Sequence, residues 1–349
     1  MMSQNPAEIA IGQDDAASDW QLKPDRHAQM LPTAAEALKR VLARDDIKEI
    51  ADSFRLADAK AIAAQARYKH IGRLGLYAAT VATLIGAIFL LPIEPWLQGS
   101  AAAIASMLQV VSLMMAFLAS RYLIIAKPFD AWMKSRAEAE IARVGLFNAV
   151  TGATEMSRDG ELPLLPLALE YFRRYQLDVQ RRYYKGRAAQ HAAAAWHNNQ
   201  WLRAGFLLTA TSVIIGVMLA FELAAASGLP VPSWLLVLPS GFAGDPGPNR
   251  ITLALGVVAS ALYGLGVARS LMDLDERNAS RYATTSDNLE FLTDKRLAEA
   301  RTAAAEANAE VVRIFVSDVQ SQISSEHREW ILLSARESAP DRLRRRQNG

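Results

Sequence analysis

The feature that most constrains this chain is a set of four long stretches without a formal charge. They cover residues 74–93, 95–120, 204–221 and 251–268. A helix of about 20 residues crosses a hydrocarbon core of roughly 30 Å, so each stretch is long enough to span a membrane or nearly so. Four buried helices of a soluble protein would need more amphipathic chain around them than this sequence offers. We therefore expect an all-α integral membrane protein with four transmembrane helices arranged as two hairpins.

The basic residues predict how these hairpins are oriented. All but one of the 38 Lys and Arg residues lie in 1–73, 121–203 and 269–349, and the exception is Arg250. Basic segments stay on the cytoplasmic side of a membrane. We therefore expect a multi-pass protein of the bacterial inner membrane, with both termini in the cytoplasm.

The chain reads as two repeats of one layout, in which an Ala-rich basic helix leads into two spans and a charged helix follows. The first repeat is expected over 34–150, with spans at about 74–93 and 100–120. The second is expected over 167–336, with spans at about 204–221 and 251–268 and a long C-terminal helix. Residues 151–166 are expected to form a linker. Residues 1–33 and the basic 337–349 have the composition of disordered tails, and 1–33 lack the basic and apolar regions of a signal peptide.

Two charged helices carry apolar stripes that need a partner. In the helix expected over 129–148, Phe129, Met133 and Ile141 recur at helical spacing. This face requires either the helix before the first span or another subunit. In the C-terminal helix, a stripe with four-residue spacing is the candidate surface for homo-oligomer formation, and it comprises Val311, Phe315, Val319 and Ile323.

Small and polar residues inside the spans give two further candidate sites. Four small residues at every fourth position of the fourth span are candidates for helix packing, either within one chain or between subunits: Gly256, Ser260, Gly264 and Ala268. The second span carries Ser106, Gln109 and Ser112 at three-residue spacing. These three are candidate pore-lining residues, although Gln109 is also suited to an interhelical hydrogen bond. Three acids near the outer ends of the spans are candidates for a ring that favours cations: Glu94, Glu222 and Asp245.

Catalytic and metal-binding patterns are absent from the sequence. There is no cysteine, no P-loop, no GxGxxG motif after a strand, no HExxH motif and no Gly-x-Ser-x-Gly motif. His191 and His197 are six residues apart, which does not place them on one helix face. The net charge of +2 favours no nucleic-acid partner. We therefore expect a protein that is not an enzyme and that has no cofactor, no metal site and no nucleic-acid partner.

Around each pair of spans, the sequence resembles the SLATT family, the two-transmembrane "SMODS and SLOG-associating" effector domains of bacteria. In the first repeat the resemblance rests on "ADAKAIAAQARYKHIGRLGL" and "WMKSRAEAEIARVGLF". In the second it rests on "YQLDVQRRYYKGRAAQHAAAAW" and "EHREWILLSARE". The chain is similar to two tandem copies, which together cover about four fifths of its length.

The resemblance implies a function that the residues alone do not. SLATT-like proteins are regarded as effectors that oligomerise to form or gate a pore in the inner membrane. They act in anti-phage or nucleotide-signalled conflict systems that lead to cell death or arrest. A separate cytoplasmic sensor or a nucleotide-second-messenger enzyme is then the expected partner, because this chain carries no fused SLOG or nucleotidyltransferase domain. The alternative is a non-conducting membrane scaffold that docks a cytoplasmic partner.

Overall fold

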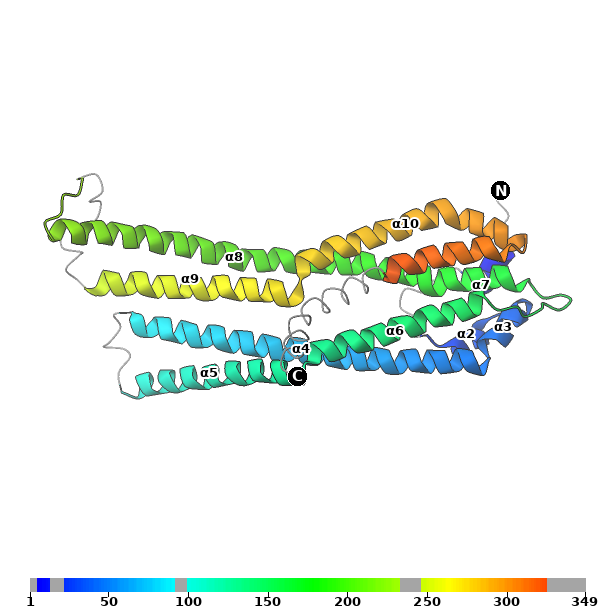
Figure 1. The fold of residues 1–349 in the computed structure, drawn as a ribbon, viewed down its shortest axis with the longest axis horizontal. Helices are drawn as coiled ribbons and strands as arrows, with labels where there is room; N and C mark the ends of the chain where they lie inside the picture. The colour runs from blue at the N-terminus through cyan, green and yellow to red at the C-terminus, as the bar shows by residue number, and fades with distance from the viewer. Residues whose placement is uncertain (1–4, 13–21, 92–98, 233–245, 325–349) are drawn as a thin grey trace, which may run out of the picture. The chain divides into compact units, whose positions relative to one another are not determined.

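The computed structural model describes residues 5–12, 22–91, 99–232 and 246–324. Within these ranges the chain is helical and contains no strand, which confirms the expected all-α class (Figure 1). The helices are α1 (Pro6–Ile11), α2 (Pro24–Met30), η2 (Thr33–Ala35), α3 (Glu36–Leu42), α4 (Asp45–Leu90), α5 (Ser100–Ala126), α6 (Pro128–Thr151), α7 (Leu164–Phe172), η3 (Arg173–Asp178), α8 (Val179–Ala226), α9 (Pro246–Asp273) and α10 (Asp275–Ala305). A further helix covers 309–324.

Four of the described helices are long and apolar enough to cross a membrane. They contain the described part of the stretches expected from the sequence and lie within the helical segments Asp45–Leu90, Ser100–Ala126, Leu164–Ala226 and Arg250–Ala305. In the most apolar window of α5 no residue is buried by the rest of the chain. Apolar side chains that stay exposed in this way are stable in a lipid environment but not in water.

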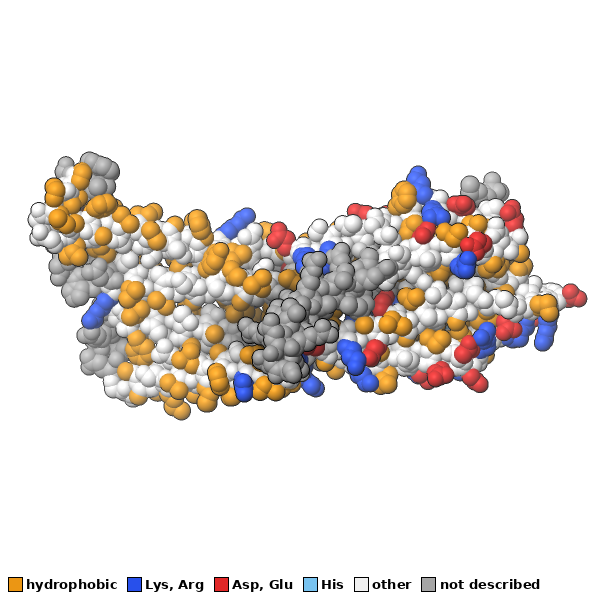
Figure 2. Space-filling view, viewed as in Figure 1, with side chains coloured by type: hydrophobic (Ala, Val, Ile, Leu, Met, Phe, Trp, Pro, Cys, Tyr) orange, Lys and Arg blue, Asp and Glu red, His pale blue; other side chains and the backbone are white. Residues whose placement is uncertain are grey.

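The chain divides into two compact units, and the division cuts across both expected repeats. The apolar unit comprises residues 66–127 and 191–276, and the charged unit comprises 1–65, 128–190 and 277–349. Apolar side chains cover the visible face of the first, whereas acidic and basic side chains gather on the second (Figure 2). Both α4 and α8 are continuous helices that belong to both units.

The two repeats share one further feature, a helix break at a single left-handed residue. Lys127, with φ of 43°, separates α5 from α6, and Leu274, with φ of 50°, separates α9 from α10. Neither residue is glycine, so both positions are strained. Pro128 then begins α6, where its missing N–H costs nothing. Each repeat thus breaks its return helix where the apolar sequence gives way to charged sequence.

Residues 1–33 do not form a wholly disordered tail. Within the described part, α1 and α2 are helical and pack into the core of the charged unit, with Ala7 and Ile11 of α1 buried. His27 of α2 is 1% exposed, stacks on Tyr175 and lies 2.9 Å from the hydroxyl oxygen of Tyr171 through Nδ1. The polar composition suggested disorder, but a few apolar side chains and one histidine pack these short helices against the core of the charged unit.

The long C-terminal helix expected at the end of the second repeat is interrupted twice within the described residues. Beyond Leu274, α10 ends at Ala305, where the N–H of Asn308 donates to the Ala303 carbonyl and Ala307 takes a φ of 58°. These are the features of a Schellman helix ending. Asn308 then accepts a hydrogen bond from the Val311 N–H at 3.4 Å, so it also caps the helix over 309–324.

This turn places the stripe that was expected to form oligomers in the core of the charged unit. Phe315, Val319 and Ile323 are no more than 2% exposed, and Val311 is partly buried against the same core. The ring of Phe315 lies edge-on to Phe172, with 6.4 Å between the ring centroids. The described residues of one chain therefore cover the stripe, and its assignment as an oligomer surface was wrong.

On α6 the apolar face is not the buried one. Glu140 and Arg143 are 6% and 3% exposed, whereas Ile141 is 71% exposed. The Arg143 guanidinium lies over the Phe54 ring, 5.0 Å from its centroid, and is 3.9 Å from Glu140 Oε1. Phe129 and Met133 are half-buried. A cation–π contact and an ion pair thus replace the apolar contact that the spacing predicted.

A buried ionic network joins α1, α7, η3 and α10 inside the charged unit. Glu170 is fully buried and accepts hydrogen bonds from Arg173 (2.6 Å) and Arg301 (2.6 and 3.1 Å). Arg301 also pairs with Glu8 of α1 at 3.0 Å. Burial raises the pKa of the Asp178 carboxyl, against the lowering effects of Arg173 and Arg181. The network lies at η3, a π-helical segment, and such segments often mark positions under functional constraint.

Candidate functional site in the apolar unit

The candidate pore-lining residues on α5 do not share one side of the helix. Gln109 and Ser112 are half-buried, whereas Ser106 is exposed. A Cβ atom built on Gly86 of α4 would lie 3.1 Å from Gln109 Nε2, so the Gln109 side chain packs against α4. Three-residue steps rotate by about 300° in an α-helix, which turns Ser106 well away from Ser112. Of the three, Ser106 alone is exposed in the single chain.

A seam between α4 and α5 was not expected from the sequence. The least exposed positions of α5 alternate between three- and four-residue spacing, and they are Ala102, Ala105, Gln109, Ser112, Ala116 and Ala119. A Cβ on Gly75 of α4 would lie 2.9 Å from the Ala119 Cβ. Small residues at this spacing let two helices approach closely in lipid. A search for small residues at a period of 3.5 would have found this seam.

The outer acidic ring cannot be assembled from the described residues. Glu94 and Asp245 lie outside them. Glu222 is half-buried near the end of α8, and no hydrogen-bond partner for its Oε1 occurs among the described residues. The ring therefore stays a prediction.

The small residues of α9 do not form one seam. A Cβ on Gly256 would lie 3.3 Å from Ser212 Oγ of α8, but Ser260 is exposed, Ala268 is half-buried, and a Cβ on Gly264 would have no neighbour within 4 Å. Four-residue steps advance by about 400°, so the stripe spirals by 40° at each step and leaves the interface. The four residues therefore do not form one packing face within a single chain, and the alternative of a seam between subunits stays a prediction.

The seam between α8 and α9 instead uses other residues. A Cβ on Gly205 would lie 2.7 Å from the Tyr263 backbone nitrogen, and one on Gly266 would lie 3.0 Å from the Leu202 side chain. Ala259 is fully buried, and Ser212 donates a hydrogen bond of 2.9 Å to the Thr252 carbonyl. Glycine is required where the two backbones come this close.

A charged cluster surrounds the break between α9 and α10. Asp273, the last residue of α9, is 7% exposed and lies 3.3 Å from Arg73 and 3.6 Å from Lys69, both on α4. Close by, Gly72 of α4 contacts Met272, because a Cβ at this glycine would lie 2.7 Å from the methionine sulfur. The end of α9 is thus bound to the first hairpin.

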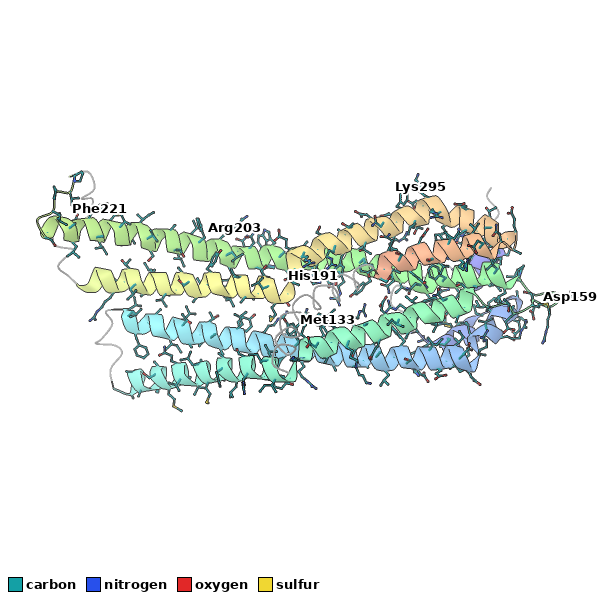
Figure 3. The ribbon with its side chains drawn as sticks, in the orientation of Figure 1. Met133, Asp159, His191, Arg203, Phe221 and Lys295 are labelled. Atoms are coloured by element: carbon teal, nitrogen blue, oxygen red, sulfur yellow. The ribbon has the colours of Figure 1, made fainter. Side chains whose placement is uncertain are left out.

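The first residue of α10 is bound to the second hairpin. Asp275 is 6% exposed and lies 2.7 Å from His191 Nδ1, while Asn198 Nδ2 donates to it at 3.1 Å. His191 and Asn198 both lie on α8, where Figure 3 labels the histidine beside the start of α10. Asp273, Leu274 and Asp275, which we call the junction, therefore hold α4, α8, α9 and α10 at one place.

Metal binding and known relatives give no further guide to function. Among the described residues there is no group of three or more His, Asp or Glu side chains that is able to hold a metal ion. No protein-family model, no curated protein and no solved structure matches this chain.

Proposed function

We propose that this protein is a multi-pass membrane effector in which the charged unit controls the four apolar helices. The observation that carries the proposal is the continuity of α4 and α8, each of which belongs to both units without a break. A helix transmits a rotation or a shift along its length because its hydrogen bonds are all internal. A partner that binds the charged unit is thereby able to act on the apolar helices.

The finer proposal is that several copies assemble and form or gate a pore in the bacterial inner membrane. The resemblance of the flanking helices to SLATT effectors supports an anti-phage or nucleotide-signalled role that ends in cell death or arrest. A separate cytoplasmic sensor or second-messenger enzyme would supply the trigger. The distribution of basic residues supports a cytoplasmic position for both termini.

A non-conducting scaffold is the second candidate function. It is favoured by the packing of Gln109 against α4 and by the partial burial of Ser112, which leave Ser106 as the exposed member of the polar set on α5. A scaffold would use the charged unit to dock a partner, and its apolar helices would serve as an anchor.

Ion flux from sealed vesicles separates the two functions. The purified protein is reconstituted into liposomes loaded with a potassium-sensitive dye, and induced bacterial cells are followed in parallel with a membrane-potential dye. The effector is expected to release potassium and depolarise cells. If the protein is correctly inserted and neither signal appears, with or without lysate from phage-infected cells as a source of the trigger, the scaffold is the better description.

A matched pair of variants on α5 locates the pore wall. Ser106→Leu removes the exposed polar group, while Val110→Leu changes a side chain that is already apolar and 64% exposed. If α5 lines the pore, Ser106→Leu should reduce flux about tenfold or more, and Val110→Leu should conduct like the wild type. Equal flux from both variants would place the pore wall elsewhere.

Reporter fusions test the proposed orientation. Fusions inserted within residues 155–165 and after Gly349 should both give a cytoplasmic signal. A periplasmic signal at either position would overturn the topology.

A further inference from the structure

The two helix breaks are alike in backbone but unlike in their surroundings. Lys127 is exposed at the first break. At the second break, Leu274 stands between two aspartates that are both at least nine-tenths buried. A left-handed non-glycine residue persists where its neighbours hold it in place. The second break is therefore a built feature, and its two carboxylates are what hold it.

The two aspartates bind in different directions. Asp273 pairs with Lys69 and Arg73, which belong to the first hairpin. Asp275 contacts His191 and Asn198, which belong to the second. The polar contacts of Asp273 with α4 therefore connect the two hairpins, whereas those of Asp275 bind the start of α10 to α8 within the second repeat.

The contacts within each hairpin are of another kind. α4 meets α5 at Gly75, and α8 meets α9 at Gly205 and Gly266, all by close backbone approach. Separating such seams would remove van der Waals contacts along the length of the helices, and lipid chains would replace these contacts poorly. At the junction, the side chains of Lys69 and Arg73 are 30% and 44% exposed, so water is able to replace Asp273 as their partner when the helices separate. The junction is therefore the place where the apolar unit separates most readily.

We propose that each hairpin moves as one body and that the hairpins part at the junction when the effector is activated. Breaking the contacts of Asp273 frees the first hairpin from α9. Breaking those of Asp275 frees α8 from the start of α10. This inference rests on the proposed effector function and assigns the moving parts within it. Lys69, Arg73, His191 and Asn198 are positioning residues in this scheme.

Engineered disulfides test the proposal directly, because the natural chain contains no cysteine. The pair Gly72→Cys with Met272→Cys links the two hairpins at a point where a Cβ atom on residue 72 would lie 2.7 Å from the Met272 sulfur. The control pair Ser212→Cys with Gly256→Cys links α8 to α9 inside one hairpin, where a Cβ atom on residue 256 would lie 3.3 Å from Ser212 Oγ. Both double variants are reconstituted into liposomes and assayed for flux when oxidised and again after reduction.

The expected result is specific to the link between hairpins. The oxidised 72–272 pair should lose at least tenfold in flux and recover on reduction, whereas the 212–256 pair should conduct in both states. Full flux through the oxidised 72–272 pair would show that the hairpins do not part at the junction. The reduced form serves as the folding control for each protein.

A second measurement does not depend on conduction. The rate of 72–272 disulfide formation is compared in the native background and in one that carries Asp273→Asn. The rate should fall severalfold in the second background, while the 212–256 rate should not change. An unchanged 72–272 rate would mean that Asp273 does not hold the hairpins together, and the inference would be wrong. If the rate falls but no protein conducts, the proposed effector function fails and the junction remains the link between hairpins.

Discussion

Replacing Phe315 by alanine tests whether the C-terminal stripe is core or surface. Phe315 is 1% exposed and meets Phe172 edge-on inside the charged unit. Loss of a buried phenylalanine removes its transfer free energy and leaves a cavity, which together cost about 3–5 kcal/mol. The adjacent Ile314 is 42% exposed, so Ile314→Ala should cost only about 0.5 kcal/mol.

Thermal unfolding of the full chain in detergent, followed by circular dichroism, measures this difference. In a unit of this size each kcal/mol lowers the melting temperature by roughly 2–4 °C, so Phe315→Ala should lower it by about 6–20 °C. Ile314→Ala should lower it by about 2 °C or less. Oligomer size, read by crosslinking below both transitions, should not differ between the two variants.

One outcome would refute the reasoning. If Phe315→Ala leaves the melting temperature unchanged and dissolves a crosslinked oligomer, the stripe is a surface between subunits. The fold-back of residues 309–324 onto α10 would then be wrong in solution.

Three further changes test other parts of the fold. Gly205→Ala places a methyl group against the backbone of α9 and should destabilise the second hairpin by about 1–3 kcal/mol, whereas Gly186→Ala, in open space, should stabilise its helix by about 0.5–1 kcal/mol; detergent unfolding midpoints compare them. Hydrogen bonds from Arg40 lower the pKa of Glu161 to about 2, so the stability it contributes is present above about pH 4.5 and is lost as the pH falls toward 2; the stability difference between wild type and Glu161→Gln should therefore vanish over that window. Glu170→Gln leaves one acceptor oxygen for two arginines and should lower the free energy of unfolding, measured with a chemical denaturant, by about 1.5–3 kcal/mol. An unchanged free energy of unfolding would mean that the buried network does not stabilise the fold.

The sequence determined the apolar helices because their signal is local. An apolar run of about 20 uncharged residues is typical of a membrane-spanning helix, and this pattern can be recognised without any distant contact. The pairing of the spans follows from the short connection between the first two and from the separation of the basic segments. Pro128 marked the start of α6 for the same reason, since the fixed φ of proline acts on its own position.

The apolar stripe on 309–324 is a feature whose packing partner could not be predicted from the sequence. The four-residue spacing correctly predicted that one face of this helix is buried. Spacing does not predict whether the same chain or a second subunit packs against that face. That depended on the reversal at Ala307, a left-handed residue without the glycine that usually signals one. Asn308 indicated the start of a new helix, because asparagine is a common N-cap residue. The strong helix formers on both sides of it nevertheless favoured one unbroken helix.

The seams and the junction were decided only by the tertiary structure. Small residues recur on several faces of α5 and α9, and which face becomes the seam depends on the rotation and the crossing of the two helices. Asp273 and Asp275 are two residues apart in a stretch that looks like any charged helix start. Their burial arises because Leu274 turns the chain so that one carboxylate reaches α4 and the other α8. Sequence fixes which side chains are available, but a contact between residues 200 positions apart exists only once the helices have been brought together.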